Sequence, residues 1–318
     1  MNPVAAILDS IVLYRYSLIL ALASAAGICF FLSCCAHVQI PFQKASAAVL
    51  TAVILSLPLA RLVYWYGRPD HFSSFIQVLS SPDTECFALA GVLAGCFLSA
   101  VIIGGPDCRK RMLDCMSVSG CFAIALGRLG SFFTDTDRGQ IMTRFTALPW
   151  AYPVANVSGQ LEYRFATFLF QAAAAALLGI LLFTIFWRKR YRQGDLFLLF
   201  TLCYSASQVI LDSTRYDSLY LRSNGFISMV QVFSAIALVA VLVILCIRTK
   251  KTLGFRGWMV PFWVSLAALF GCAGYMEYYV QRHGREAAFS YSIMGLCLLG
   301  IVGLGLILWK QSRNVERE

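Results

Sequence analysis

Long apolar runs recur from one end of this chain to the other, and they constrain its fold more than any other feature. Each is about 20 residues long, the length of helix that crosses the hydrocarbon core of a bilayer. An α-helix is suited to that core because it pairs all of its backbone polar groups internally. With 59% hydrophobic and 13% charged residues, the composition excludes a soluble globule. The sequence therefore predicts an all-α, polytopic transmembrane helical bundle, with nine spans near 12–33, 46–66, 86–104, 112–133, 164–187, 195–213, 226–248, 258–280 and 289–309.

The basic residues predict how this bundle is oriented. All of the lysines fall on one side of the expected spans, at Lys44, Lys110, Lys189, Lys250, Lys251 and Lys310, whereas the loops on the other side carry only arginine. Because cytoplasmic loops are enriched in lysine and arginine, we expect the N-terminus outside and the C-terminus inside. The formal charge of +10 is then explained by insertion and by anionic lipid headgroups, without a nucleic-acid partner.

Two parts are expected along the chain. Residues 1–250 form a membrane core, and its longest outer loop, 134–163, is interpreted as a small folded cap because it is long and aromatic. Residues 251–318 add two C-terminal spans and a tail. We expect no cofactor and no metal site, since the chain has no Cys-x-x-Cys pair and only three scattered histidines. Most of the cysteines lie within spans and are interpreted as small hydrophobes.

One arginine lies at the end of an expected span, where an ionised side chain is energetically costly. Arg128 follows Gly127 and precedes Gly130 by two residues, at the polar end of span 112–133. An ionised side chain in hydrocarbon costs several kcal/mol unless it has a partner or a water-filled cavity. A guanidinium also matches the geometry of phosphate groups. We therefore interpret Arg128 as a binding group for an anion, most simply a lipid phosphate.

A second polar feature follows one face of span 195–213. Tyr204, Gln208, Asp212 and Arg215 are spaced at i, i+4, i+8 and i+11, which places them on one side of a helix. Asp212 and Arg215 are close enough in sequence to pair. A structural ion pair near the interface explains those two residues alone. The inward extension through Tyr204 and Gln208 favours a stripe that lines a cavity.

Other residues in the spans have simpler interpretations. Small residues at 120, 123, 127 and 130 let a neighbouring helix approach closely, and we expect Gly91 and Gly95 of the preceding span to face them. Arg61 either extends its charge to the interface or contributes to the anion site. Glu277 is interpreted as a residue near the outer interface rather than a catalytic acid.

Together these segments resemble a known family. The run 127–139 reads Gly-Arg-Leu-Gly-Ser-Phe-Phe-Thr-Asp-Thr-Asp-Arg-Gly. It is similar, without insertion, to the signature Gly-Arg-x-Gly-Asn-Phe-x-Asn-x-Glu-x-x-Gly of the prolipoprotein diacylglyceryl transferases. The segment 13–18, with Tyr16, resembles the family's first helix, and 60–64 resembles its Gly-Ala-Arg-x-x-Tyr element. The stripe from Tyr204 to Arg215 resembles its Tyr-x-x-x-Arg-x-x-x-Glu-x-x-Arg helix, so the resemblance covers about residues 10–248.

The chain departs from this family at several polar positions. Leu89-Ala90-Gly91 stands where the family has His-Gly-Gly, and Leu169-Phe170-Gln171 stands where it has Leu-Tyr-Glu. The remaining departures replace the signature asparagines by Ser131 and Thr134, its glutamate by Thr136, and the helix arginine and glutamate by Gln208 and Asp212.

The resemblance implies a fold, a reaction and a set of site residues. The family moves a diacylglyceryl group from phosphatidylglycerol to the thiol of a lipobox cysteine in a prolipoprotein, in the bacterial cytoplasmic membrane. Phosphatidylglycerol, or another anionic phospholipid, and a lipobox peptide are thus the expected partners. By position, the catalytic set would be Arg128, Asp212 and Tyr204. The lipid- and phosphate-binding set would be Tyr16, Arg61, Gly127, Gly130, Ser131, Gly139, Gln208 and Arg215, with Asp135 or Asp137 in place of the missing glutamate.

Two alternatives remain beside this reading. The chain could be a catalytically inactive or repurposed lipid-binding relative, in which the cavity is kept and the chemistry is not. It could also be a membrane scaffold or transporter that uses its last two spans for partner contact. The sequence shows no inverted pair of broken helices of the kind that carriers use.

Overall fold

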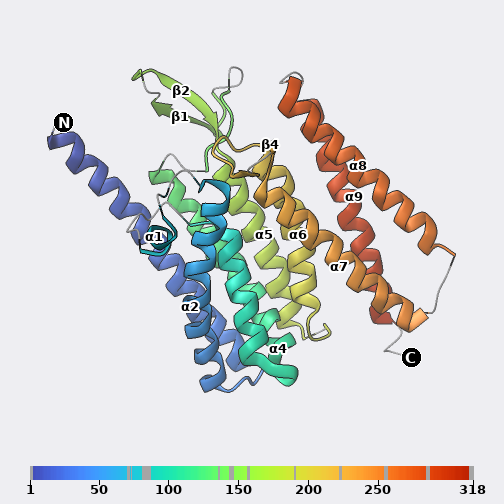
Figure 1. Ribbon diagram of the computed structural model, residues 1–318. Coiled ribbons are helices and arrows are strands. Elements are labelled where there is room, and N and C mark those ends of the chain that lie inside the picture. The colour runs from blue at the N-terminus through green and yellow to red at the C-terminus, as the bar shows by residue number, and fades with distance from the viewer. Residues whose placement is uncertain are drawn as a thin grey trace.

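The structure is a bundle of long helices with two small strand pairs at one end (Figure 1). It is a computed structural model that describes residues 3–69, 72, 74–80, 87–134, 137–142, 147–155, 158–189, 191–221, 224–253, 257–283 and 287–314. The long helices are α1 (Pro3–His37), α2 (Phe42–Gly67), α4 (Leu89–Leu129), α5 (Thr167–Trp187), α6 (Asp195–Ser213), α7 (Met229–Leu253), α8 (Met259–His283) and α9 (Ala287–Asn314). The short elements are α3 (Phe75–Ser80), the 3-10 turn η2 (Gly130–Phe133), β1 (Ala151–Ala155), β2 (Leu161–Phe165), β3 (Tyr220–Leu221) and β4 (Asn224–Ser228).

Eight stretches of the described residues are long and apolar enough to cross a membrane, and one of them contains two crossings. That stretch, Leu89–Phe133, has 45 residues, and its backbone breaks at Gly105 with φ of +57°. Glycine adopts this left-handed conformation without strain, and Pro106 then begins a new helical segment. Divided at Gly105, the stretch accounts for two of the nine predicted spans. The all-α polytopic fold predicted from the sequence is thus confirmed.

The two halves of α4 run in opposite directions. In the first half, Ala88 N donates to Ala60 O at 3.1 Å and Ser99 Oγ donates to Ala48 O, so this half runs antiparallel to α2. In the second half, Arg111 Nη1 donates to Val38 O at 3.2 Å, whereas Gly130, just past the helix, packs on Tyr16 of α1. The second half is therefore antiparallel to α1, and it carries Arg128 to the end of the bundle where the strands lie.

Glycines allow close helix packing, but not between the partners that the sequence suggested. A Cβ added at Gly91 would lie 2.4 Å from the Cα of Ala60, and one added at Gly95 would lie 2.6 Å from the Cα of Ser56. Both glycines therefore face α2, and the prediction that they face the small residues of the following span is wrong. Three of those residues, at 123, 127 and 130, pack on α1 instead: a Cβ at Gly127 would meet Leu20 at 3.7 Å. Spacing identified the small-residue face, whereas the chain path decides which helix occupies it.

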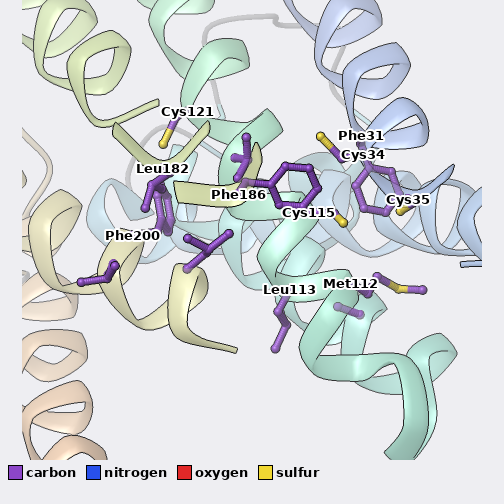
Figure 2. Close-up of a cluster of buried hydrophobic side chains, with 14 of the residues drawn as sticks. Phe31, Cys34, Cys35, Met112, Leu113, Cys115, Cys121, Leu182, Phe186 and Phe200 are labelled. Carbon is purple, nitrogen blue, oxygen red and sulfur yellow. The ribbon is translucent and has the colours of Figure 1, made fainter. Parts of the chain in front are cut away.

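Two apolar clusters fill the bundle, and α6 contributes to both. The first lies among α1, α2, α4, α5 and α6, and includes Phe31, Cys34, Cys35, Cys115 and Phe186 (Figure 2). Figure 2 shows these thiols lying among the aromatic and aliphatic side chains, so they act as small apolar groups. The second cluster joins α6 and α7 to α8 and α9. As the element common to both, α6 is the most extensively buried of the eight candidate spans in the described residues.

The strands gather at one end of the bundle, here called the hairpin end (Figure 1). Strands β1 and β2 form an antiparallel hairpin in which Ala151 pairs with Phe165 and Ala155 with Leu161. Isolated bridges join Gly139 to Arg215 and Ile141 to Arg164, so the loop before the hairpin is tied to the segment after α6. The hairpin takes up the last part of the loop 134–163 that was interpreted as a cap and extends two residues beyond it. Residues 135, 136, 143–146, 156 and 157 lie outside the described residues.

Buried acids at the opposite end of the bundle fix the start of α6. Asp114 accepts hydrogen bonds from Gly194 N at 2.6 Å and Phe197 N at 3.0 Å, which pairs two amides that a helix start leaves open. Asp195 accepts a hydrogen bond from Arg248 Nη1 at 3.0 Å. These contacts hold α6 at one end, and its other end enters the site described next.

Candidate functional site

Arg128 ends the second half of α4, and its side chain points into the bundle. Its side chain is 14% exposed, and its Nη1 lies 2.6 Å from Asp137 Oδ2. The 3-10 turn η2 follows at once and turns the chain across the hairpin end, which returns Asp137 to Arg128. The predicted partner for a charge at this depth is therefore present.

Asp137 is the acid at the centre of the site. Besides Arg128, its carboxylate contacts Arg215 Nη2 at 2.9 Å and accepts a hydrogen bond from Ser131 Oγ at 2.9 Å. Its own amide donates to Asp217 Oδ2 at 3.0 Å. The backbone at Asp137 is left-handed, with φ of +58°, a conformation that aspartate tolerates better than most residues. Asp135, the other predicted substitute for the signature glutamate, lies outside the described residues.

The charges around Asp137 set its ionisation state. Burial by itself would raise the pKa of this carboxyl group, but the guanidinium groups of Arg128 and Arg215 outweigh burial, and hydrogen bonds from Arg128 and Ser131 add to their effect. Together they hold the pKa of Asp137 well below its usual range. The group is thus a permanent anion at neutral pH and a poor proton acceptor.

Arg215 contacts Asp137 and two further acids, Asp212 of α6 and Asp217 of the loop that follows α6. Its Nη1 lies 3.4 Å from Asp212 Oδ1, and its Nε donates to Asp217 Oδ1 at 3.0 Å. Burial would lower the pKa of Arg215, but Asp137, Asp217 and Asp212 raise it, so the guanidinium stays charged. Asp212 also accepts a hydrogen bond from Ser228 Oγ at the end of β4. The predicted pairing of Asp212 with Arg215 is confirmed.

The polar stripe of α6 continues into the bundle below this network. Tyr204 and Gln208 are both buried, and the Tyr204 ring lies within electrostatic range of Arg128. The Tyr204 hydroxyl is buried close to the Arg128 guanidinium but makes no hydrogen bond of good geometry in the described residues. A buried hydroxyl that is not well paired costs free energy, so it is suited to bind a polar group of a ligand.

Gln171 is a further buried polar group that sequence reasoning noted without assigning a role. It is 1% exposed, and neither its Nε2 nor its Oε1 has a hydrogen-bond partner in the described residues. α5 runs antiparallel to the second half of α4, with Phe168 against Phe132 and Gly179 against Cys121. That register places Gln171 near the level of Arg128. The signal available in the sequence was an amide within an otherwise apolar span.

Arg138 belongs to the site region, although the sequence suggested only that it lay on the outer side. Its guanidinium is buried over the rings of Tyr152 and Phe168, 3.8 Å and 4.8 Å from their centroids, and donates to Thr134 O at 2.7 Å. These contacts join the hairpin to the signature loop through a cation held against aromatic faces. Its place between Asp137 and Gly139 in the signature run was the signal that could have found it.

Three of the predicted small or aromatic residues pack where the signature run meets α1 and β2. A Cβ at Gly130 would lie 3.3 Å from the Tyr16 ring, and one at Gly139 would lie 2.7 Å from Phe165 O. Gly139 is thus required for the close approach of the signature loop to β2. Arg61 is buried on another side, where its Nη1 donates to Val78 O at 3.1 Å and its guanidinium lies over Phe87.

An apolar hollow opens beside the site between α2 and α7. It holds about 370 Å³ and is lined by residues that include Leu59, Tyr66, Met229 and Phe233. Met229, which lines the hollow, directly follows Ser228, whose hydroxyl contacts Asp212. In the described residues, no cluster of three or more potential metal ligands is found.

Comparison with known proteins places this geometry in context. A family model described as prolipoprotein diacylglyceryl transferase matches residues 3–247. Three relatives bear the name phosphatidylglycerol--prolipoprotein diacylglyceryl transferase. The protein of Acaryochloris marina is 26% identical over 237 residues, covering 72% of this chain and 84% of its own length. That of Limosilactobacillus reuteri is 26% identical over 221 residues (64% and 76%), and that of Bacillus licheniformis is 24% identical over 255 residues (76% and 92%).

Proposed function

This chain belongs to the prolipoprotein diacylglyceryl transferase family, and we propose that it transfers a diacylglyceryl group from phosphatidylglycerol to the lipobox cysteine of a prolipoprotein. The observation that carries this proposal is the pair of inward-facing guanidinium groups, Arg128 and Arg215, that meet on Asp137 near the hairpin end. Both are mostly buried, so an anion that reaches them meets strong, weakly screened donors.

The charge balance indicates how a phosphate would bind. Arg128 and Arg215 are matched in the free protein by Asp137, Asp212 and Asp217, so the site holds no excess positive charge. A phosphodiester must therefore use guanidinium N–H groups that the carboxylates leave open, or displace Asp137 from one arginine. Five N–H donors on each guanidinium make the first mode available. Tyr204 and Gln171 add neutral groups beneath the arginines that can bind the glycerol hydroxyls or ester oxygens.

The reaction requires one bond to form and one to break. The cysteine sulfur, as thiolate, attacks the glyceryl carbon that carries the phosphate; the C–S bond forms and the C–O bond breaks with its electron pair on the phosphate oxygen. The thiol proton leaves the sulfur, and glycerol phosphate is released. Arg128 stabilises the charge that develops on that oxygen, and Arg215 assists. Asp212 orients Arg215 and is the weak base of the set, because Asp137 is too acidic to accept the proton.

The position of the hollow between α2 and α7 supports lateral entry of the lipid. Its apolar lining fits an acyl chain, and its lining residue Met229 is next in the chain to Ser228, which contacts Asp212; we infer that the headgroup then lies toward Asp212 and Arg215. We place the protein in the bacterial cytoplasmic membrane with the hairpin end outside, where a prolipoprotein peptide would arrive. The lysine distribution of the sequence supports that orientation.

The direct test is mass spectrometry of a lipobox peptide incubated with the purified protein and phosphatidylglycerol. We expect the mass increase of a diacylglyceryl thioether. Arg128→Ala should lower product formation by about 10²-fold or more, the scale reported when a donor to developing negative charge is removed. Arg282→Ala, at an exposed arginine of α8, is the matched control and should leave the rate unchanged.

Two results would redirect the proposal. Product formation that is unaffected by Arg128→Ala would overturn the assignment of the site. Specific binding of phosphatidylglycerol with no turnover would support the alternative of a catalytically inactive lipid-binding member. The replacement of the signature glutamate and the helix arginine by Thr136 and Gln208 makes that outcome worth measuring.

A further inference from the structure

The last two helices lie beyond the part of the chain that matches the family, yet they reach the site. The family match ends at residue 247, whereas α8 and α9 cover Met259–His283 and Ala287–Asn314. They pack against each other, and α9 also packs against α6 and α7 (Figure 1). Apolar packing alone would explain a helix pair that simply accompanies the core. Two polar contacts at the hairpin end require a more specific explanation.

Glu277 of α8 is a buried carboxylate in a membrane helix. It is 7% exposed, its Oε2 accepts a hydrogen bond from Ser213 Oγ at 2.5 Å, and its Oε1 accepts one from Gln281 Nε2 at 3.2 Å. An acid at such a position is costly, and acids that are retained there usually serve a function. The sequence suggested a residue near the outer interface; the structure adds that this side chain contacts the end of α6.

Ser213 of α6 forms hydrogen bonds with both α8 and α9. Its hydroxyl donates to Glu277, and its carbonyl accepts a hydrogen bond from the Tyr291 hydroxyl of α9 at 3.2 Å. It is the final residue of α6, directly after Asp212 and two residues before Arg215. A shift of Ser213 therefore moves the Asp212 carboxylate and the Arg215 guanidinium relative to Asp137.

Contacts with α5 and within the following loop also fix this end of α6, and Glu277 adds a contact from α8. Thr214 Oγ1 lies 2.9 Å from Thr167 Oγ1 of α5, and Ser218 Oγ donates to Asp212 O at 2.9 Å. Tyr220, in β3 beyond Arg215, is in electrostatic range of both Asp212 and Glu277. Contacts from α5 and α8 thus hold the end of α6 and the residues that follow it.

We propose that the α8–α9 pair is part of the functional assembly, with Glu277 as a positioning residue that fixes Ser213 and thereby sets the geometry of Asp212 and Arg215. The expected change in kcat rests on the proposed function, because it presupposes that the protein catalyses the transfer. The proposed role of Glu277 extends that function, because the site is then completed by helices outside the matched part of the chain. Misplacement of a binding group by about 1 Å can lower a rate by about 10²-fold, so a small shift suffices.

The test uses the full chain with Glu277→Leu, Ser213→Ala and the double variant, assayed for thioether formation and for thermal unfolding in detergent. We expect Glu277→Leu to lower kcat by about tenfold or more. Ser213→Ala should have a similar effect, and the double variant should be no worse than Glu277→Leu, because both changes break one contact. Tyr275→Phe, at an exposed position of α8, is the control and should match the unchanged protein.

A second measurement keeps the proposal separate from the proposed function. The rise in unfolding temperature on adding phosphatidylglycerol, relative to phosphatidylcholine, reports the arginine site without any turnover. We expect Glu277→Leu to reduce that rise while the unfolding temperature without lipid stays close to that of the unchanged protein. Should the unchanged protein bind phosphatidylglycerol without forming product, the proposed function fails and this inference is still tested.

Four outcomes would overturn the inference. The first is a Glu277→Leu variant with unaltered kcat and an unaltered lipid-specific rise, and the second is simple addition of the effects of Glu277→Leu and Ser213→Ala. A Glu277→Leu variant that loses activity only in proportion to its loss of stability, and keeps the lipid-specific rise in unfolding temperature, would show that Glu277 is only a structural contact. An unchanged protein with neither turnover nor a response to phosphatidylglycerol would overturn both proposals.

Discussion

At the scale of single residues, the site depends on which side chain supplies the carboxylate of the family signature's glutamate, because this chain lacks that glutamate. The signature glutamate is Thr136 here, and the sequence offered Asp135 and Asp137 as substitutes. The structure brings Asp137 to Arg128 and Arg215 through a left-handed backbone at that residue. The sequence could identify the residue type and the loop. It could not identify the register, because a single backbone conformation decides where the carboxylate points.

Asp137→Asn tests this ion network through its pH dependence. The folded pKa of Asp137 is depressed, so its contribution to stability is fully present above the ordinary carboxyl value of about 3.9 and is lost as pH falls toward the folded value. Removing one partner of a buried ion pair costs about 3–5 kcal/mol, and we expect Asp137→Asn to lower stability on that scale at pH 7.

Thermal unfolding of the purified protein and the variant, from pH 8 down to pH 3, provides the measurement. The difference between the two curves should stay constant from pH 8 to about pH 5 and shrink below about pH 4. A difference that disappears between pH 7 and pH 5 would mean that Asp137 titrates normally and is not held by the arginines. Ser131→Ala removes only a hydrogen bond and should produce a smaller loss.

At the scale of helices and strands, hydropathy predicted most of the fold. The long apolar runs became helices because a bilayer leaves few other ways to satisfy the backbone. The face of α6 that carries Tyr204, Gln208 and Asp212 was correctly predicted from helical spacing, and all three are buried. The partner of Gly91 and Gly95 was not, because spacing along one helix does not specify which neighbour the chain path brings to it. The β1–β2 hairpin was not predicted as a strand pair, although residues 156–160 between its strands include the turn-type dipeptide Ser158-Gly159.

Two glycines of α4 provide a matched pair for testing the close contact with α2. A Cβ at Gly91 would fall 2.4 Å from backbone atoms of Ala60 and Leu59, whereas one at Gly120 would meet nothing within 4 Å. Gly91→Ala should therefore force the helices apart and cost about 1–3 kcal/mol, the usual scale of overpacking. Gly120→Ala should be neutral or stabilise by up to about 1 kcal/mol, because alanine is the better helix former.

Thermal unfolding of both variants in the same detergent measures this difference. Each variant adds one methyl group to a helical half of α4, so helix propensity favours both variants and does not account for a loss at Gly91 alone. Equal unfolding temperatures would show that α2 and the first half of α4 are not in the close contact described above.

At the scale of the whole molecule, α6 contributes side chains to both apolar clusters of the bundle. One side of it belongs to the cluster shared with α1, α2, α4 and α5, and the other to the cluster shared with α7, α8 and α9. In a soluble protein, removing the second cluster would expose apolar surface to water and unfold the chain. In a bilayer, lipid tails replace the lost apolar neighbours, and the cost is limited to packing and hydrogen bonds.

Truncation after residue 256 separates these contributions. The shortened chain covers the family match and keeps the Arg128–Asp137 pair, but it lacks Glu277 and Tyr291. We expect it to insert and to remain monodisperse on size exclusion, because its first cluster is intact. Its turnover should fall at least as far as that of Glu277→Leu, since Ser213 loses both of its contacts to the C-terminal helices. Aggregation of the truncated chain would show that lipid does not substitute for α8 and α9. Turnover equal to that of the full chain would show instead that the end of α6 holds its position without them.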